Sequence, residues 1–286
     1  MRHAALLAVP ALLLAGCTSV VGTPGKLQVV ASAYPFAWLA EQVGGSAVEV
    51  TNLVKGGAEP HDIELTPRQV GLVEQAAVVV YLAGFQPAVD DALHGGTQGF
   101  DLGKVVTQQP LKGESNAKDP HIWLDPVRME QAATGIAERL AAKDPRHAAD
   151  YRARAAAAVT ALSGLDATFT KALTHCVRTQ IVTSHSAFGY LAARYGLVQK
   201  GISGLSPDAE PSPGRVAEVA ALAKREGVTT IFFESLVDPK VAQTVASEIG
   251  ADTAVLDPVE GVKSGDDYLR VQRRNAQALH DALGCA

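Results

Sequence analysis

The chain has 286 residues, of which 47% are hydrophobic, and it carries a formal net charge of −5 at pH 7. This length allows about two domains with buried cores. The acidic balance and the absence of a run of basic residues exclude nucleic acid as the main partner.

The N-terminal segment has the features of an export signal. Arg2 and His3 precede an apolar stretch at residues 4–14, which is too short to span a membrane because a spanning helix needs about 20 residues. The stretch instead matches the apolar part of a secretory signal peptide. It ends in LAGC (residues 14–17), which resembles the lipobox of bacterial lipoproteins. We therefore predict a signal peptide at residues 1–16, a diacylated Cys17 that anchors the chain, and a tether at 17–26; an ordinary signal with a chance cysteine is the alternative.

Strand-like and helix-like runs alternate along the rest of the chain, which is typical of an α/β fold. We expect strands at residues 27–34, 48–54, 78–83, 180–183, 228–233 and 253–256. We expect helices at residues 36–43, from Pro67, and at 126–142, 187–195, 213–226, 239–249 and 268–283.

Residues 146–173 have no proline and a single glycine, Gly164, and they are rich in Ala, Leu and Arg. This composition predicts one long helix of about 40 Å at 1.5 Å per residue. Because it stands between the two α/β halves, we interpret it as the connector. The predicted division is a first lobe at 27–145, a linker helix at 146–174 and a second lobe at 175–286.

Four segments place a metal-ligand residue type in a loop before a helix: EPHD (59–62), DPHIWLDP (119–126), TSHS (183–186) and LDP (256–258). In open α/β sheets, ligands bind beyond the carboxyl ends of the strands. If the two sheets face each other, His61, His185 and Asp257 converge there. One loop histidine alone is weak evidence, so the inference depends on the set.

These segments and others resemble the zinc- and manganese-binding receptor lipoproteins of bacterial ABC importers, the family of ZnuA- and TroA-like solute-binding proteins. The resemblance covers nearly all of the mature chain. It implies an α/β fold of two Rossmann-like lobes with mainly parallel sheets, joined by one long rigid helix, with the metal in the cleft between the lobes. The motifs that carry it are GAEPHDIELTPRQV (57–70), DPHIWLDP (119–126), TSHSAFGYLAARYGL (183–197), GISGLSPDAEPSP (201–213), IFFE (231–234) and VLDP (255–258).

The resemblance implies four metal ligands: His61, His121, His185 and Asp257. Three imidazoles and one carboxylate suit tetrahedral Zn²⁺, whereas carboxylate-rich sites suit manganese. The third position is histidine in zinc members of the family and often glutamate in manganese members, so His185 favours zinc. A manganese or iron receptor remains an alternative, because residues 111–118 lack the long histidine-rich loop of many zinc members.

The implied function is an extracytoplasmic solute-binding lipoprotein, monomeric and anchored to the outer face of the cytoplasmic membrane. It captures Zn²⁺, or Mn²⁺ in the alternative, and delivers it to an ABC permease and its ATPase; cell adhesion is a further activity at the level of the family. A secreted zinc-dependent hydrolase and an adhesin with structural zinc are the alternatives of another class. We predict no enzyme, because catalytic zinc keeps an open coordination position and the chain has no His-Glu-x-x-His or Gly-x-Ser-x-Gly motif.

Glu59, Glu210 and Glu234 lie in family-like motifs, and each is a candidate to orient a ligating histidine; the alternative for each is a capping or solvated carboxylate. Once Cys17 is lipidated, Cys176 and Cys285 remain as an even pair in an oxidising compartment. They form either a disulfide or two free thiols.

Metal release needs a part of the site that moves. We expect the loop that carries Asp257 to shift when the receptor docks on the permease, since Gly261 and Gly265 follow it.

Overall fold

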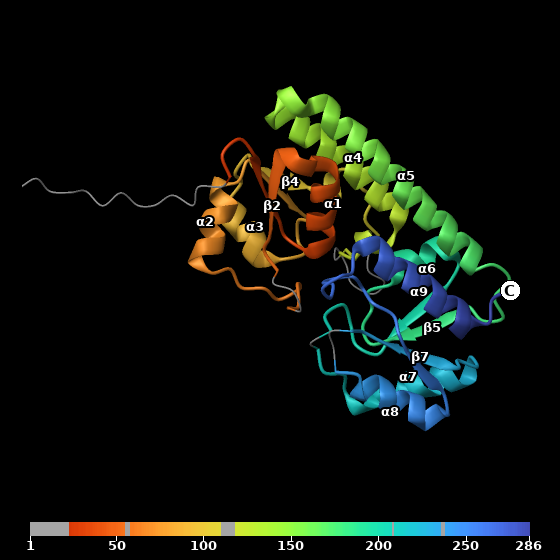
Figure 1. Cartoon of the computed structure of the whole chain (residues 1–286). Coiled ribbons are helices and arrows are strands. Elements are labelled where there is room, and N and C mark those ends of the chain that lie inside the picture. The colour runs from red at the N-terminus through yellow and green to blue at the C-terminus, as the bar shows by residue number, and fades with distance from the viewer. Residues whose placement is uncertain (1–22, 55–57, 110–117, 208, 236–237) are drawn as a thin grey trace, which may run out of the picture.

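The computed structural model describes residues 23–54, 58–109, 118–207, 209–235 and 238–286. Within these ranges the chain forms two α/β lobes, each built on its own sheet, with a long helix lying along both (Figure 1). None of the helices in these ranges is both long and apolar enough to cross a membrane. The predicted signal peptide and Cys17 fall outside the described residues, as does most of the 111–118 loop.

The first lobe contains a four-stranded parallel sheet in the order β2-β1-β3-β4. Its strands are β1 (Leu27–Ala31), β2 (Val48–Asn52), β3 (Val78–Tyr81) and β4 (Gly99–Asp101). The helices are α1 (Tyr34–Gly44), α2 (Pro67–Gln75), α3 (Pro87–Leu93) and α4 (Pro126–Lys143), with short 3-10 turns η1 (Gly45–Ala47), η2 (Leu102–Lys104) and η3 (Ile122–Leu124). Strand β4 and helix α3 were not predicted from the sequence.

Helix α2 begins where the sequence indicates. The Thr66 side chain accepts a hydrogen bond from the backbone N–H of Gln69, whose side chain in turn receives the Thr66 backbone N–H. This reciprocal capping satisfies backbone donors at the helix start, and Pro67 occupies the first helical position. The cap fixes the end of the loop that carries His61.

The second lobe repeats the same order of strands, β6-β5-β7-β8, again all parallel. The strands are β5 (Gln180–Thr183), β6 (Val198–Gly201), β7 (Thr230–Phe233) and β8 (Asp252–Val255). The helices are α6 (Gly189–Tyr195), α7 (Pro213–Arg225), α8 (Lys240–Ile249) and α9 (Tyr268–Leu283). Strand β6 was not predicted.

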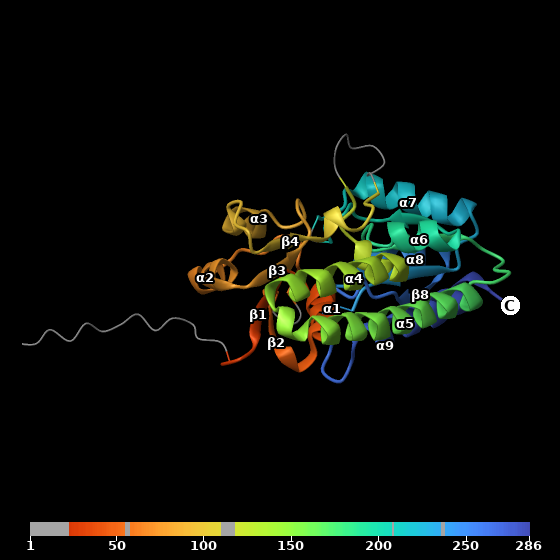
Figure 2. The ribbon, with the colours of Figure 1, turned by 90° about the horizontal axis from the view of Figure 1, so that it is seen from above.

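The connector is α5 (Ala148–Ala172), which follows the short turn η4 (Pro145–His147). It packs against α1 and α4 of the first lobe and against α9 of the second (Figures 1 and 2). Its buried side includes Tyr151, Leu162, Leu165 and Phe169, none of which is exposed. Because one continuous helix is packed into both cores, it limits how far the spacing of the two lobes can change.

A disulfide joins Cys176 to Cys285. The first cysteine lies just before β5 and the second just after α9, so the bond ties the two ends of the second lobe together. The structure therefore contains the disulfide rather than two free thiols.

Candidate metal centre

Three histidines and one glutamate converge between the lobes. One ligand atom from each of His61, His121, His185 and Glu260 lies within 4.8 Å of the others. His61 lies in the loop before α2, His121 directly before η3, His185 two residues after β5 and Glu260 in the loop after β8. Two of the loops, those of His185 and Glu260, leave the carboxyl ends of second-lobe strands, as expected for an α/β ligand site.

The spacing of these atoms suits a small tetrahedral ion. Nε2 of His61 lies 3.2 Å from Nε2 of His121. Oε1 of Glu260 lies 3.4, 3.5 and 3.7 Å from Nε2 of His61, His121 and His185. A tetrahedral zinc site with bonds of about 2.0–2.1 Å has edges of about 3.3 Å. The cluster therefore already has nearly the dimensions of such a site.

Two of its atoms have no hydrogen-bond partner within the described part of the chain. Nε2 of His185 and Oε1 of Glu260 are both buried and form no hydrogen bond. His121 and His185 are 0% exposed and Glu260 is 3% exposed. Leaving a buried polar atom unpaired costs about 1–3 kcal/mol. A cation placed among the four groups would satisfy both atoms, so the residues present fit a metal ion.

Carboxylates behind two of the histidines fix their orientation. Nδ1 of His121 lies 2.8 Å from Oδ1 of Asp119, and Nδ1 of His185 lies 2.6 Å from Oε1 of Glu234. In both rings this contact leaves Nε2 directed at the cluster. Such carboxylate–histidine pairs are the usual support of metal-ligating imidazoles.

The same contacts control the ionisation of the metal-free site. Burial lowers the pKa of His185, but Glu234 and Glu260 outweigh it and raise the pKa to about 10. Asp119 and Glu260 likewise outweigh burial and raise the pKa of His121. The pKa of His61 is lowered, chiefly by burial. Burial raises the pKa of Glu260, but the three histidines hold it well below its usual value.

The structure corrects the fourth predicted ligand, because Asp257 is not part of the cluster. One of its carboxylate oxygens accepts the backbone N–H of Val259 at 2.8 Å, and the other is bonded to the Ser235 hydroxyl. Val259 has φ +59°, an unusual value for a β-branched residue. The Asp257 carboxylate thus stabilises a tight turn, and this turn directs Glu260, three residues later, at the histidines.

The three predicted supporting glutamates differ in position. Glu234 contacts His185, as described above. Glu59 accepts the backbone N–H of His61 at 2.9 Å. Glu210 is exposed and is not among the carboxylates that contact the three histidines. Asp119 does support a histidine but was not singled out from the sequence, although it lies two residues before His121.

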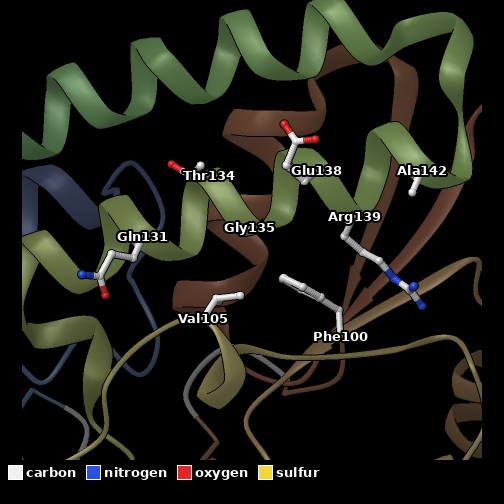
Figure 3. A pocket seen from close by; sticks show the side chains of 8 residues that line it. All are labelled: Phe100, Val105, Gln131, Thr134, Gly135, Glu138, Arg139 and Ala142. Carbon is white, nitrogen blue, oxygen red and sulfur yellow. The ribbon is translucent and has the colours of Figure 1, made fainter.

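A separate hollow lies on the first lobe, beside α4 (Figure 3). It has a volume of about 700 Å³, and its lining includes Phe100, Val105, Gly135 and Arg139. None of its lining residues belongs to the cluster, so we do not assign it to the metal centre.

Comparison with known proteins agrees with this geometry. The family model described as "Zinc-uptake complex component A periplasmic" matches residues 29–282. The chain belongs to this zinc-uptake component family. The match includes all four residues of the cluster and both lobes.

Two curated relatives illustrate the family. The high-affinity zinc uptake system protein ZnuA of Bacillus subtilis is 32% identical over 280 residues, which cover 90% of this chain and 88% of the relative. The zinc-binding protein AdcA of Streptococcus pyogenes serotype M6 is also 32% identical, over 89% of this chain. This chain spans only 56% of that AdcA.

Two solved structures share the fold. One is the laminin-binding protein Lmb of Streptococcus agalactiae, described as a bifunctional protein with adhesin and metal-transporting activity. It has a TM-score of 0.83 and 34% identity, and the match covers 90% of this chain and 100% of that one. The Zn(II)-bound ZnuA-like domain of Streptococcus pneumoniae AdcA has a TM-score of 0.79 and 33% identity, over 91% and 99% of the two chains.

Proposed function

We propose that this chain is an extracytoplasmic receptor that captures Zn²⁺ between its lobes and delivers it to the permease and ATPase of an ABC importer. The observation that carries the proposal is the buried cluster of three imidazole nitrogens and one carboxylate oxygen at the spacing of a tetrahedral site. Membership of a zinc-uptake family supports the transport role.

The ligands in this proposal are His61, His121, His185 and Glu260. Three imidazoles favour zinc over manganese, which prefers oxygen donors. A ZnuA-like domain of similar fold was solved with Zn(II) bound, which supports the same choice here. A manganese or iron cargo is the alternative within the same transport role.

Receptor function also agrees better with the cluster than hydrolysis does. A catalytic zinc keeps an open position beside about three protein ligands. Here four protein groups surround the cation position, and three of them are almost completely buried. Four protein ligands complete a tetrahedral shell, which supports our proposal that the bound ion is cargo.

The anchoring of the receptor is part of the proposal. The family description names a periplasmic component, which implies an exported protein. The LAGC sequence that ends in Cys17 supports a lipid anchor on the outer face of the cytoplasmic membrane. Incorporation of labelled palmitate into the wild-type chain, and its loss in Cys17→Ser, would test the anchor.

The metal assignment is tested on the soluble chain that starts after Cys17. The protein is stripped of metal and offered equal Zn²⁺ and Mn²⁺, and the bound ions are counted by mass spectrometry. We expect one zinc per chain in the wild type and none in His121→Ala. His94→Asn is the matched control, because His94 has φ +41° at the end of α3 and asparagine tolerates that conformation. A preference for manganese would change the cargo, whereas no stoichiometric metal would refute the proposal.

A further inference from the structure

Hydrogen bonds that cross between the lobes hold two of the four ligand loops. The first involves Tyr190, which lies on α6 of the second lobe. Its hydroxyl donates a hydrogen bond to the backbone carbonyl of Asp119 at 2.9 Å. Asp119 lies two residues before His121, on the loop that the first lobe contributes to the site. A second-lobe side chain therefore holds a first-lobe ligand loop.

The second bond runs in the opposite direction. Trp123 lies in η3, and its ring packs against Phe36 and Phe85 of the first lobe, at centroid distances of 5.7 and 5.5 Å. Its indole N–H donates to the backbone carbonyl of Pro258 at 2.7 Å. Pro258 lies two residues before Glu260, on the loop that the second lobe contributes. A first-lobe side chain therefore holds a second-lobe ligand loop.

Both donors are fully buried, and the Tyr190 hydroxyl stays protonated. Tyr190 and Trp123 are each 0% exposed. Burial raises the pKa of Tyr190 to about 12, so its hydroxyl keeps its proton at neutral pH. The same hydroxyl accepts the backbone N–H of Gln109 at 2.8 Å, which fixes the direction in which it donates.

The packing at α6 is equally tight. A Cβ atom added at Gly189 would lie only 2.7 Å from a carboxylate oxygen of Asp119. The helix and the ligand loop are therefore in direct contact, so the hydrogen bond forms only while the two lobes are together.

The other two ligand loops each have a shorter hydrogen bond from their own lobe, and the hydrogen bond that reaches the His61 loop from the second lobe, from Ser206 to Asp62, is exposed and 3.4 Å long. Gln86 donates to the carbonyl of Pro60, next to His61, at 2.8 Å. The Thr183 hydroxyl donates to the carbonyl of His185 at 2.6 Å. Separation of the lobes would leave these two bonds in place.

We propose that Tyr190 and Trp123 are reciprocal positioning residues, which keep His121 and Glu260 in place only while the lobes are closed. This inference rests on the proposed metal-receptor function. It follows that a small separation of the lobes breaks both hydrogen bonds together. The loops of His121 and Glu260 then lose their support from the opposite lobe, whereas the own-lobe bonds beside His61 and His185 remain. Release of the ion thus requires no large hinge motion.

The test compares two substitutions on the same helix. Tyr190→Phe removes the hydroxyl that holds the ligand loop. Tyr195→Phe, the control, removes a hydroxyl that donates to Asp166 at 2.8 Å, away from the site. A neutral hydrogen bond contributes about 0.5–1.5 kcal/mol. We therefore expect Tyr190→Phe to dissociate zinc about 3- to 10-fold faster, with no change in Tyr195→Phe.

Two further readouts separate a positioning role from a structural one. The visible spectrum of the Co²⁺-loaded protein reports ligand geometry, and it should change in Tyr190→Phe but not in Tyr195→Phe. Both metal-free variants should unfold in one cooperative thermal transition, which shows that each is folded. Equal dissociation rates and identical Co²⁺ spectra in the two variants would overturn the inference.

Trp123→Phe provides an independent variant, because it removes the indole donor to Pro258. It should also accelerate dissociation and alter the Co²⁺ spectrum, even if the smaller ring lowers the melting temperature. A folded Trp123→Phe protein with wild-type dissociation would count against the second half of the proposal. Failure of the wild type to bind any metal would instead refute the receptor function itself.

Discussion

Substitution of Glu260 and Asp257, one at a time, tests which carboxylate binds the metal. Glu260→Gln keeps the size of the side chain and removes its charge. Oε1 of Glu260 faces all three histidine Nε2 atoms at 3.4–3.7 Å, so the ion would lose its one anionic ligand. Loss of a residue that merely supports a ligand costs about 10- to 100-fold in metal affinity. Loss of the ligand charge itself should therefore cost at least about 100-fold, or about 2.8 kcal/mol at 1.4 kcal/mol per factor of ten.

Asp257→Asn is the matched comparison. The oxygen of the amide can still accept the backbone N–H of Val259, which Asp257 binds at 2.8 Å. The turn should persist, and we expect zinc affinity to change by less than about 3-fold, because a retained hydrogen bond loses only part of its roughly 1 kcal/mol. Competition against a chelator of known zinc affinity measures both variants at one pH. A 100-fold loss in Asp257→Asn together with wild-type affinity in Glu260→Gln would refute the reasoning.

Two further predictions concern supporting contacts. Glu234→Leu removes the acceptor 2.6 Å from Nδ1 of His185 and should weaken zinc binding about 10- to 100-fold, which the same competition assay would detect; unchanged affinity would exclude an orienting role. Asp166 accepts two hydrogen bonds from Arg194, at 2.6 and 2.8 Å, and these contacts lower its pKa. Asp166→Asn should therefore lower the free energy of unfolding at pH 7 by about 1–2 kcal/mol in urea titrations, because the pair is partly exposed. Since the folded pKa is depressed, this difference should shrink as pH falls below about 4, and a difference that persisted at low pH would contradict the assignment.

The extent to which the sequence predicted the fold depended on the length of each element. The long helix α5 and the capped helix α2 carry strong local signals. Helix α5 is a long proline-free run rich in Ala, and α2 has a Thr-Pro start. Strand β4 has three residues, and β6 (Val198–Gly201) contains Gln and Lys at a sheet edge. Such short or polar segments acquire their conformation from pairing with a neighbouring strand, which no local pattern records.

The metal site shows the same limit. The three histidines lie in loops that the strand pattern or the family resemblance indicated, and the structure brings them together. Glu260 was missed because Asp257 and Glu260 both lie in the first part of its loop, and sequence position alone does not show which of them forms the turn. One sequence signal could have separated them, because an aspartate side chain readily accepts the backbone N–H two residues later, as Asp257 does here. Once Asp257 is used in the turn, Glu260 faces the cluster, while Asp266 pairs with Arg274 and Asp267 caps α9.

The charges around the cluster predict that protons are released when zinc binds. Three buried carboxylates, those of Asp119, Glu234 and Glu260, contact its imidazoles. With neutral histidines they would place three negative charges in the interior, which is costly unless compensated. In the metal-free protein, protons on His121 and His185 supply the compensation, since both have a raised pKa and that of His185 is about 10.

One Zn²⁺ carries the same charge as those two protons, so the ion can replace them without a change in the net charge of the site. In the metal-free protein the raised pKa of His185 should stabilise the fold below about pH 6.5, and this stabilisation should be lost as pH approaches 10. On zinc binding we expect between one and two protons to be released per ion at pH 6.5, and the apparent zinc affinity to rise with pH from 6.5 towards 10. Calorimetric titration of zinc in buffers of different ionisation enthalpy counts the released protons. Release of fewer than about 0.5 proton per ion would mean that the histidines are already neutral, and that charge exchange does not govern binding.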